Sequence, residues 1–283
     1  MQRKSAFIKF ITALLTGVIL CQTAGCKGFF DSNGPSWDYN SEINKAAARN
    51  HKPFTGAISS DPEYDLPEMT EPFKVIDISA WQEKVDFKAV AESGVDGVIL
   101  RLARYDMDKD TYFDRNYSEA KKNGLMVGCY YFMGAQSTDE AYSDAEKVTK
   151  LLDEKKYELE LPVFYDVEDE HGSLSGNISS LDRQLLTDII KTFCETMREN
   201  GYYTGYYSTV SFAEKEYYPE QLCQYPFWVA RWSESVSAQL TYYVWQYSAT
   251  GSVPGVNGEC DINLCFADFC TYIEKHGYNN LSK

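Results

Sequence analysis

The feature that most constrains the fold is an alternation of short apolar runs and helical stretches that begins at Lys74. The apolar runs are rich in β-branched and aromatic residues, which are typical of strands. Helices between successive strands indicate a parallel sheet, because parallel strands need a long crossover connection. The expected strands are Lys74–Ile78, Gly97–Ala103, Met126–Met133, one within Leu161–Glu170, Tyr203–Ser208, Phe227–Trp232, Tyr242–Tyr247 and Asp261–Leu264.

Helices are expected between the strands of the first two-thirds of this region, and a glycine follows several of them as a stop signal. The last three strands follow one another too closely for long helices. This arrangement predicts an α/β fold, an irregular (β/α) TIM-like barrel with eight strands and fewer helices in its C-terminal third. The expected helices are Phe87–Ser93, Phe113–Asn123, Thr138–Glu154 and Ser180–Asn200.

The fourth strand leads into a cluster of carboxylates, in the stretch Leu161–Glu170 (LPVFYDVEDE). Residues two apart on a strand point to the same face, so Asp166 and Glu168 share one side, with Cα atoms roughly 6.6–7 Å apart. Acid/base cleavage of a glycosidic bond needs two such carboxylates, although a solvated acidic strand end would have the same sequence. Asp77 also ends a strand, and functional groups of barrels lie at these ends. The acidic cluster is therefore a candidate active site.

The N-terminus has the pattern of a targeting segment. Basic residues at positions 3, 4 and 9 precede an apolar run, Phe10–Cys21, that is shorter than a membrane span. Thr23–Cys26 (TAGC) resembles a bacterial lipobox, whose cysteine is lipidated. We therefore expect a lipoprotein-type signal peptide over residues 1–25 and a lipid on Cys26, with a plain secretory signal as the alternative. Either signal predicts export, to the outer face of the cytoplasmic membrane and the cell wall or to the medium.

The segment after this signal differs in composition from the barrel. Residues 26–73 contain prolines, mixed charges and little periodicity, so they are expected to form a tether, with one short helix around Ser41–Arg49. The barrel is expected to span residues 74–275 and a C-terminal tail residues 276–283. We expect a monomer.

The charge of the chain excludes several partners. Its formal net charge of −15 disfavours nucleic acid and anionic membranes, so a membrane is reached only through the expected lipid. The eight cysteines and three histidines form no metal-binding spacing, so no metal and no cofactor is expected. No disulfide pairing is assigned, and Cys260 could either brace its loop or remain a free buried thiol.

Four motifs, in order, resemble those of family-25 glycoside hydrolases, the barrel-shaped lysozymes that cut peptidoglycan. The resemblance covers about residues 74–269 and departs from the family pattern at Arg101–Tyr105 and at Tyr131. The motifs are Ile76–Ser79 with Trp81-Gln82, Tyr165–Glu168, Phe227–Trp232, and Trp245–Tyr247 continuing through Gly251–Gly255 to Asp261–Asn263.

This resemblance implies roles for the acidic residues. Glu168 would be the general acid that protonates the departing sugar oxygen. Asp166 would orient and stabilise the acetamido group of the substrate or act as a base. Asp77 and Asp261 would complete the acidic pocket and set its protonation states. Carboxylates crowded within a few Å cannot all be ionised, which agrees with one being held protonated.

The resemblance also implies substrate-binding residues, for which ordinary structural roles are the alternative. Tyr130, Tyr207, Trp228 and Trp245 would line the sugar groove, although tryptophans on strands are often part of the core. Arg231 would clamp the substrate or form a salt bridge inside the barrel.

The resulting prediction is a peptidoglycan hydrolase that cleaves the β-1,4 bond between N-acetylmuramic acid and N-acetylglucosamine. Its partners would be peptidoglycan glycan strands. The alternatives are a wall-binding lipoprotein without catalysis and a hydrolase of another N-acetylated polysaccharide. Whether the reaction retains or inverts the anomeric configuration stays open, with the substrate acetamido route preferred.

Overall fold

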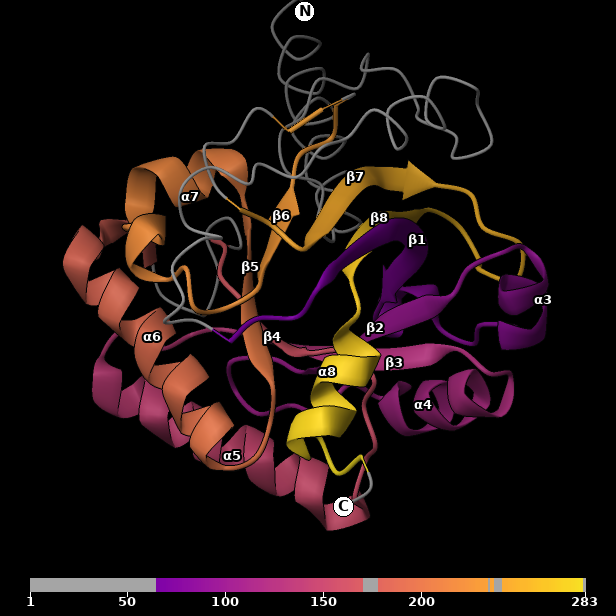
Figure 1. The fold of residues 1–283 in the computed structure, drawn as a ribbon, viewed down its shortest axis with the longest axis horizontal. Helices are drawn as coiled ribbons and strands as arrows, with labels where there is room; N and C mark the ends of the chain where they lie inside the picture. Colours follow the sequence, from indigo (N-terminus) through magenta and orange to yellow (C-terminus); the bar gives the residue numbers. More distant parts are fainter. Residues whose placement is uncertain (1–64, 170–177, 234, 237–240, 282–283) are drawn as a thin grey trace, which may run out of the picture. The chain divides into compact units, whose positions relative to one another are not determined.

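Eight strands pair in sequence order and close into a barrel, seen in the computed structural model of Figure 1. The structure describes residues 65–169, 178–233, 235–236 and 241–281, so the expected signal segment, Cys26 and the helix around Ser41–Arg49 lie outside it. The strands are β1 (Met69–Ile78), β2 (Gly97–Ala103), β3 (Met126–Phe132), β4 (Val163–Asp166), β5 (Thr204–Thr209), β6 (Phe227–Ala230), β7 (Val244–Gly251) and β8 (Cys260–Ala267).

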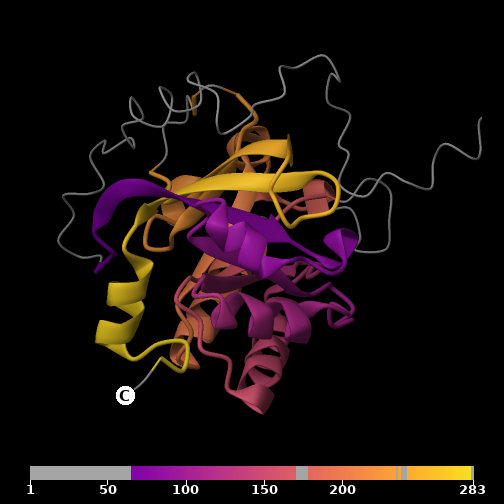
Figure 2. The ribbon, with the colours of Figure 1, turned by 90° about the vertical axis from the view of Figure 1, so that its right-hand side faces the viewer.

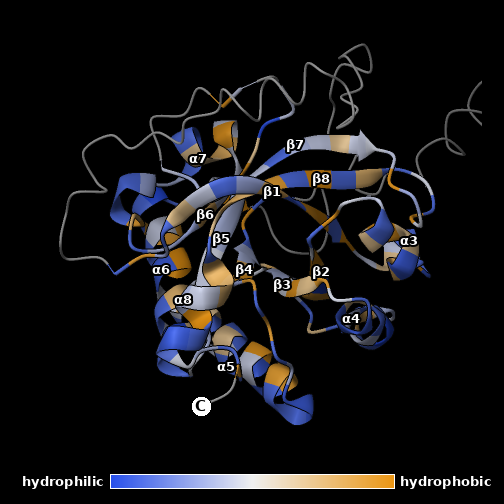
Figure 3. Ribbon diagram, turned by 45° about the vertical axis from the view of Figure 1, so that its right-hand side comes forward, coloured by the Kyte–Doolittle hydropathy of each residue, from blue (hydrophilic) through white to orange (hydrophobic). Residues whose placement is uncertain are grey.

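The helices cover the outside of this barrel. They are α3 (Phe87–Glu92), α4 (Phe113–Lys122), α5 (Thr138–Lys155), α6 (Arg183–Glu199), α7 (Val210–Glu216) and α8 (Phe269–His276), with short 3-10 turns η1 (Ala80–Gln82), η2 (Ile178–Ser180) and η3 (Pro219–Gln221). Figure 3 shows apolar residues on the parts of α5 and α6 that face the barrel and polar residues on their outer sides. The predicted irregular α/β barrel is confirmed.

The last strand departs from the expected parallel sheet. Strands β1 to β7 run parallel, but β8 is antiparallel to both of its neighbours, β7 and β1. The connection between β7 and β8 spans residues 252–259 and contains no helix, so it is too short for a crossover. The three strands lie side by side in Figure 2. As a consequence, the start of β8 lies at the same end of the barrel as the ends of β1 and β7.

Alternation along each strand divides the core into an inner and an outer layer. On β4, Phe164 points into the barrel, where its ring lies 5.2 Å from that of Trp228. The neighbouring Tyr165 points outward and stacks on Phe193 of α6 at 3.9 Å between ring centroids. Asp166 therefore points inward, two residues after Phe164, at the end of the strand.

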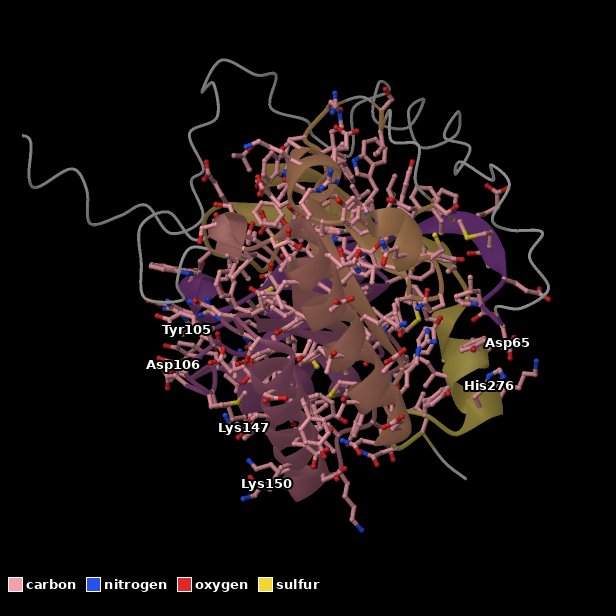
Figure 4. The ribbon with its side chains drawn as sticks, turned by 90° about the vertical axis from the view of Figure 1, so that its left-hand side faces the viewer. Asp65, Tyr105, Asp106, Lys147, Lys150 and His276 are labelled. Carbon is pink, nitrogen blue, oxygen red and sulfur yellow. The ribbon has the colours of Figure 1, made fainter. Side chains whose placement is uncertain are left out.

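The chain enters the barrel at the end opposite to that of Asp166. Strand β1 begins at Met69, within the segment expected to be a tether. Just before it, Asp65 Oδ2 lies 2.8 Å from Nε2 of His276 at the end of α8, and the Tyr272 hydroxyl donates to the Asp65 carbonyl. Figure 4 shows Asp65 and His276 next to each other. These contacts fix the first described residues to the last helix.

Candidate active site

The four predicted acids meet at one end of the barrel. Asp77 is the next-to-last residue of β1, Asp166 ends β4, and Glu168 follows two residues later. Asp261 is the second residue of β8, and its reversed direction brings it to the same end. The hydroxyl of Tyr207 on β5 is close enough to all four carboxylates for their charges to raise its pKa, although burial is the larger cause.

Asp77 and Asp261 form the centre of the cluster. They are register partners on antiparallel strands, so both side chains emerge on the inner face of the sheet. Burial raises the pKa of Asp77 from 3.8 to about 6, against the opposing effect of its hydrogen bonds. Burial and the neighbouring charge of Asp77 raise the pKa of Asp261 well above its usual range. The hydrogen bond between the two carboxyl groups acts on them in opposite directions, since it raises the pKa of Asp261 and lowers that of Asp77.

Asp166 and Glu168 occupy different environments. Asp166 is only 5% exposed, and the carbonyl of its residue accepts the amide hydrogen of Met133. Glu168 lies beyond the end of β4 and is partly exposed, so a substrate can reach it. The amide hydrogen of Val167, between them, donates to the Tyr207 carbonyl and fixes the backbone from which both carboxylates project.

Asp77 is held from below by two amides. Its Oδ2 accepts hydrogen bonds from Gln246 Nε2 on β7 at 3.1 Å and from Asn263 Nδ2 on β8 at 2.8 Å. Both amide residues are buried. Sequence reasoning placed Gln246 and Asn263 within motifs but assigned them no role, because a motif does not show which side chains point into a barrel.

The turn after β1 is attached to the adjacent loops. Ser79 and Gln82 cap η1 reciprocally, and the Gln82 side chain reaches the Glu259 carbonyl at 3.3 Å. The Ala80 amide donates to Asp110 Oδ2 at 2.7 Å, and the same oxygen lies 2.9 Å from Arg101 Nη2. Asp110 was not predicted as a site residue; the buried charge pair that it forms was not visible in the sequence.

Tyr130, Tyr207 and Trp228 pack inside the barrel, whereas Trp245 belongs to the outer layer of the core, and this placement corrects the prediction for the two tryptophans. Trp228 is 2% exposed, and its indole packs against Tyr207 at 4.6 Å and Tyr130 at 6.2 Å between ring centroids. Trp245 is 1% exposed and donates its Nε1 hydrogen to the carbonyl of Arg231. At these exposures neither indole presents an open face to solvent.

Of the remaining predicted binding residues, Tyr130 is partly buried, Tyr207 is buried, and Arg231 is exposed after β6. The exposure of Arg231 excludes the alternative of a salt bridge inside the barrel.

The described residues contain no cluster of three or more histidine, cysteine or acidic side chains arranged to hold a metal ion. The six cysteines that the structure describes are unpaired, and Cys260 is a buried thiol, which answers the alternative left open for it. Among the described helices, none is long and apolar enough to cross a membrane.

Comparison with known proteins agrees with this geometry. The sequence profile of glycosyl hydrolases family 25 matches residues 76–256. The uncharacterized protein YegX of Escherichia coli K12 is 28% identical over 199 residues, which cover 67% of this chain and 68% of YegX.

Solved structures show the same similarity. The modular autolysin LytC of Streptococcus pneumoniae, in complex with a synthetic peptidoglycan ligand, superimposes with a TM-score of 0.63 at 26% identity over 69% of this chain. The match spans about half of LytC, 47% of its chain. A bacterial lysozyme of Streptomyces coelicolor superimposes with a TM-score of 0.61 at 25% identity, over 74% of this chain and 98% of the lysozyme.

Proposed function

Because the chain belongs to glycosyl hydrolases family 25, we propose that it hydrolyses peptidoglycan glycan strands at the β-1,4 bond between N-acetylmuramic acid and N-acetylglucosamine. The observation that carries this proposal is the convergence of four carboxylates around the Tyr207 hydroxyl, at the end of the barrel where β1 and β4 finish. The similarity to a bacterial lysozyme and to an autolysin solved in complex with a synthetic peptidoglycan ligand supports the choice of substrate.

Glu168 is the proton donor in this proposal. It is the one of the four acids that lies beyond the end of its strand, and its partial exposure allows contact with a bound glycan. A general acid has to reach the oxygen of the bond that breaks, within about 2.6–3.2 Å. The carboxyl group gives its proton to that oxygen as the carbon–oxygen bond breaks, so the sugar leaves as a neutral alcohol.

Asp166 assists a reaction in which the substrate supplies the nucleophile. The 2-acetamido oxygen of N-acetylmuramic acid attacks the anomeric carbon, and an oxazolinium-type intermediate carries the positive charge. The buried carboxylate of Asp166, on the same strand face as Glu168, stabilises that charge and orients the acetamido group. Water, activated by the deprotonated Glu168, then opens the intermediate with net retention of configuration.

Asp77 and Asp261 set the charge at the base of the acidic site. The pair shares one proton, so it carries a single negative charge. A negative charge at this depth attracts the positive charge that develops on the sugar ring, and it is less screened than a charge at the surface. The pair therefore contributes electrostatic stabilisation without contacting the departing oxygen.

The location in the cell follows from the substrate and from the N-terminal sequence. We propose that the protein is exported and held at the outer face of the membrane by a lipid on Cys26. The wall glycans lie outside the membrane, so an enzyme acting on them needs export. The TAGC sequence supports a lipid rather than a simple signal.

A turbidity assay on purified cell walls tests the proposed activity. Mass spectrometry of the products identifies the new reducing ends, which should be N-acetylmuramic acid. Reducing N-acetylglucosamine would instead indicate cleavage of the other glycosidic bond. Wall binding without any product would favour the wall-binding lipoprotein, and cleavage of chitin oligosaccharides in place of wall would favour another N-acetylated polysaccharide.

A further inference from the structure

Two buried amides donate hydrogen bonds to the same oxygen of Asp77. Asn263 Nδ2 lies 2.8 Å and Gln246 Nε2 lies 3.1 Å from Asp77 Oδ2. Asn263 is 0% exposed and Gln246 3% exposed, so bulk water does not compete for these bonds. Hydrogen bonds donated to a carboxylate favour its ionised form. The two amides therefore favour the ionised form of Asp77.

The orientation of the Asn263 amide is determined by its neighbours. Trp228 Nε1, which can only donate, lies 2.8 Å from Asn263 Oδ1. Asn263 Nδ2 also lies 3.3 Å from the Val75 carbonyl, which can only accept. The amide oxygen must therefore face the indole, and its NH₂ group must face Asp77.

Gln246 is oriented in the same manner from another strand. The hydroxyl of Tyr207 donates to Gln246 Oε1 at 3.3 Å, which turns the NH₂ group of Gln246 toward Asp77. Two chains of hydrogen bonds therefore run upward from aromatic donors in the barrel interior, one through each amide, and both end on Asp77 Oδ2. The buried aromatic residues act on the acids through these amides.

Asp261 differs from Asp77 in its exposure and in the effect of the hydrogen bond between them. It is partly exposed, it lies opposite Asp77 across the strand pair, and its hydrogen bond with Asp77 raises its pKa. Two facing carboxylates share one proton, and hydrogen-bond donors to only one of them determine which carboxylate is ionised. The amides stabilise the charge on the deeper member of the pair, so the proton stays on the shallower one.

We infer that Asn263 and Gln246 are positioning residues that hold the negative charge of the acidic pair on Asp77 and the proton on Asp261. This inference rests on the proposed function, in which Glu168 becomes negative when it protonates the departing oxygen. Glu168 is close enough to Asp261 for their charges to interact. A neutral Asp261 avoids repulsion with the newly formed Glu168 anion, because the fixed charge lies deeper in the barrel.

The other titratable groups around Asp77 do not replace this arrangement. Asp166 and Glu168 approach from β4 and Tyr207 from β5, while Cys260 precedes Asp261 on β8. Burial raises the pKa of both the Tyr207 hydroxyl and the Cys260 thiol well above their usual ranges, so both stay neutral at working pH. Changes of charge between pH 4 and 8 therefore come from the carboxylates.

The test uses Asn263→Leu and Gln246→Leu in the full-length protein. Each variant removes one donor to Asp77, so its ionisation should move to higher pH, by about one pH unit. We expect the acid limb of the kcat/KM profile to shift upward by that amount. We also expect kcat to fall by about 10–100-fold while KM changes less than about threefold, since neither amide contacts the glycan.

Trp228→Phe tests the same inference at a different residue, again through the acid limb of the kcat/KM profile. It keeps an aromatic ring in the barrel interior and removes the donor that orients Asn263. We expect an acid-limb shift in the same direction as for Asn263→Leu, but smaller, because the amide remains. This variant also tests the inference if either leucine variant does not fold.

The matched control is Asn116→Leu. Asn116 is another buried asparagine, 2% exposed, but it lies on α4 outside the barrel and accepts a hydrogen bond from Arg115. The Asn116→Leu variant should have a lower melting temperature and an unchanged pH dependence of kcat/KM. A uniform loss of rate in the Asn263, Gln246 and Trp228 variants, with no shift of the acid limb, would overturn the inference.

A spectroscopic titration separates this inference from the proposed function. Side-chain carboxyl ¹³C signals of Asp77 and Asp261, identified with Asp77→Asn and Asp261→Asn, report ionisation without any substrate. The Asp77 signal should titrate at higher pH in Asn263→Leu and Gln246→Leu than in the wild type. Unchanged titration of Asp77 in both variants would reject the inference, whereas absence of wall hydrolysis by the wild type would reject the proposed function alone.

Discussion

Asp261 lies directly opposite Asp77 across an antiparallel pair of strands, and this pairing brings two carboxylates together at the floor of the site. In a barrel made only of parallel strands, a residue at the start of β8 would lie at the far end. The reversed direction of β8 therefore determines the composition of the site, because it adds a fourth acid to the three supplied by β1, by the end of β4 and by the residues that follow β4.

Replacing Glu168 by Gln should remove the proton donor and preserve the shape of the side chain. We expect the rate of wall hydrolysis to fall by about 10²–10⁴-fold. Circular dichroism and thermal melting should match the wild type. Near-normal lysis by a folded Glu168→Gln protein would contradict the assignment of the general acid.

The stereochemistry of the product distinguishes the possible roles of Asp166. Retaining carboxylate pairs lie about 5–5.5 Å apart and inverting pairs about 6.5–9.5 Å, and backbone spacing on one strand permits either. Proton NMR of the first-formed anomer should show retention, and glycan lacking the N-acetyl group of muramic acid should be cut far more slowly. An inverted product would instead make Asp166 a general base.

Lipidation of Cys26 can be tested apart from catalysis. In Cys26→Ser, the protein should remain unprocessed or be released from the membrane fraction, while the purified protein still hydrolyses wall. Mass spectrometry of the N-terminal peptide of the wild type should show the lipid. Identical fractionation and identical N-terminal mass for both proteins would indicate a simple secretory signal.

A buried acid outside the site should make stability depend on pH. Burial raises the pKa of Asp144, on α5, from 3.8 to about 6, so the folded state holds this proton more tightly than the unfolded state. Its contribution to stability is therefore complete below about pH 3.8 and is lost as pH rises toward 6.

Asp144→Asn should reduce that loss, because the amide does not ionise. Between pH 4 and 7 its melting temperature should fall less than that of the wild type, by roughly 2–4 °C. Asp108→Asn, at an exposed position, should melt like the wild type at each pH. Parallel melting curves for the wild type and Asp144→Asn would show that Asp144 does not titrate in this range.

The sequence was sufficient to predict the barrel because strand and helix periods differ along the chain. It did not predict the reversal of β8, since the residue pattern of a strand does not give its direction until its partners are known. Helix α8 was also missed, although its signals were present: Asp268 accepts from the Thr271 amide at its start, and Gly277 ends it with a φ of +68°.

The sequence predicted the positions of the acids in the candidate site better than those of the aromatic residues. That the four acids would lie close together was expected because functional groups of barrels lie at the ends of strands. Trp228 was assigned to the groove, and the structure shows it below, where it orients Asn263. Alternation tells which residues share a face, but in a barrel both faces are apolar, so it cannot tell which of them is the inside.

The closure of the barrel by β1 and β8 has a consequence for the order in which the protein is made. Asp77 and Asn263 are 186 residues apart in the chain. Ribosomes deliver the first acid long before its partner and the amide that supports it. A polypeptide that stops before β8 lacks Asp261 and Asn263 and leaves β1 unpaired along one edge. The acidic site and the closed barrel are therefore completed together, by the last strand to be synthesised.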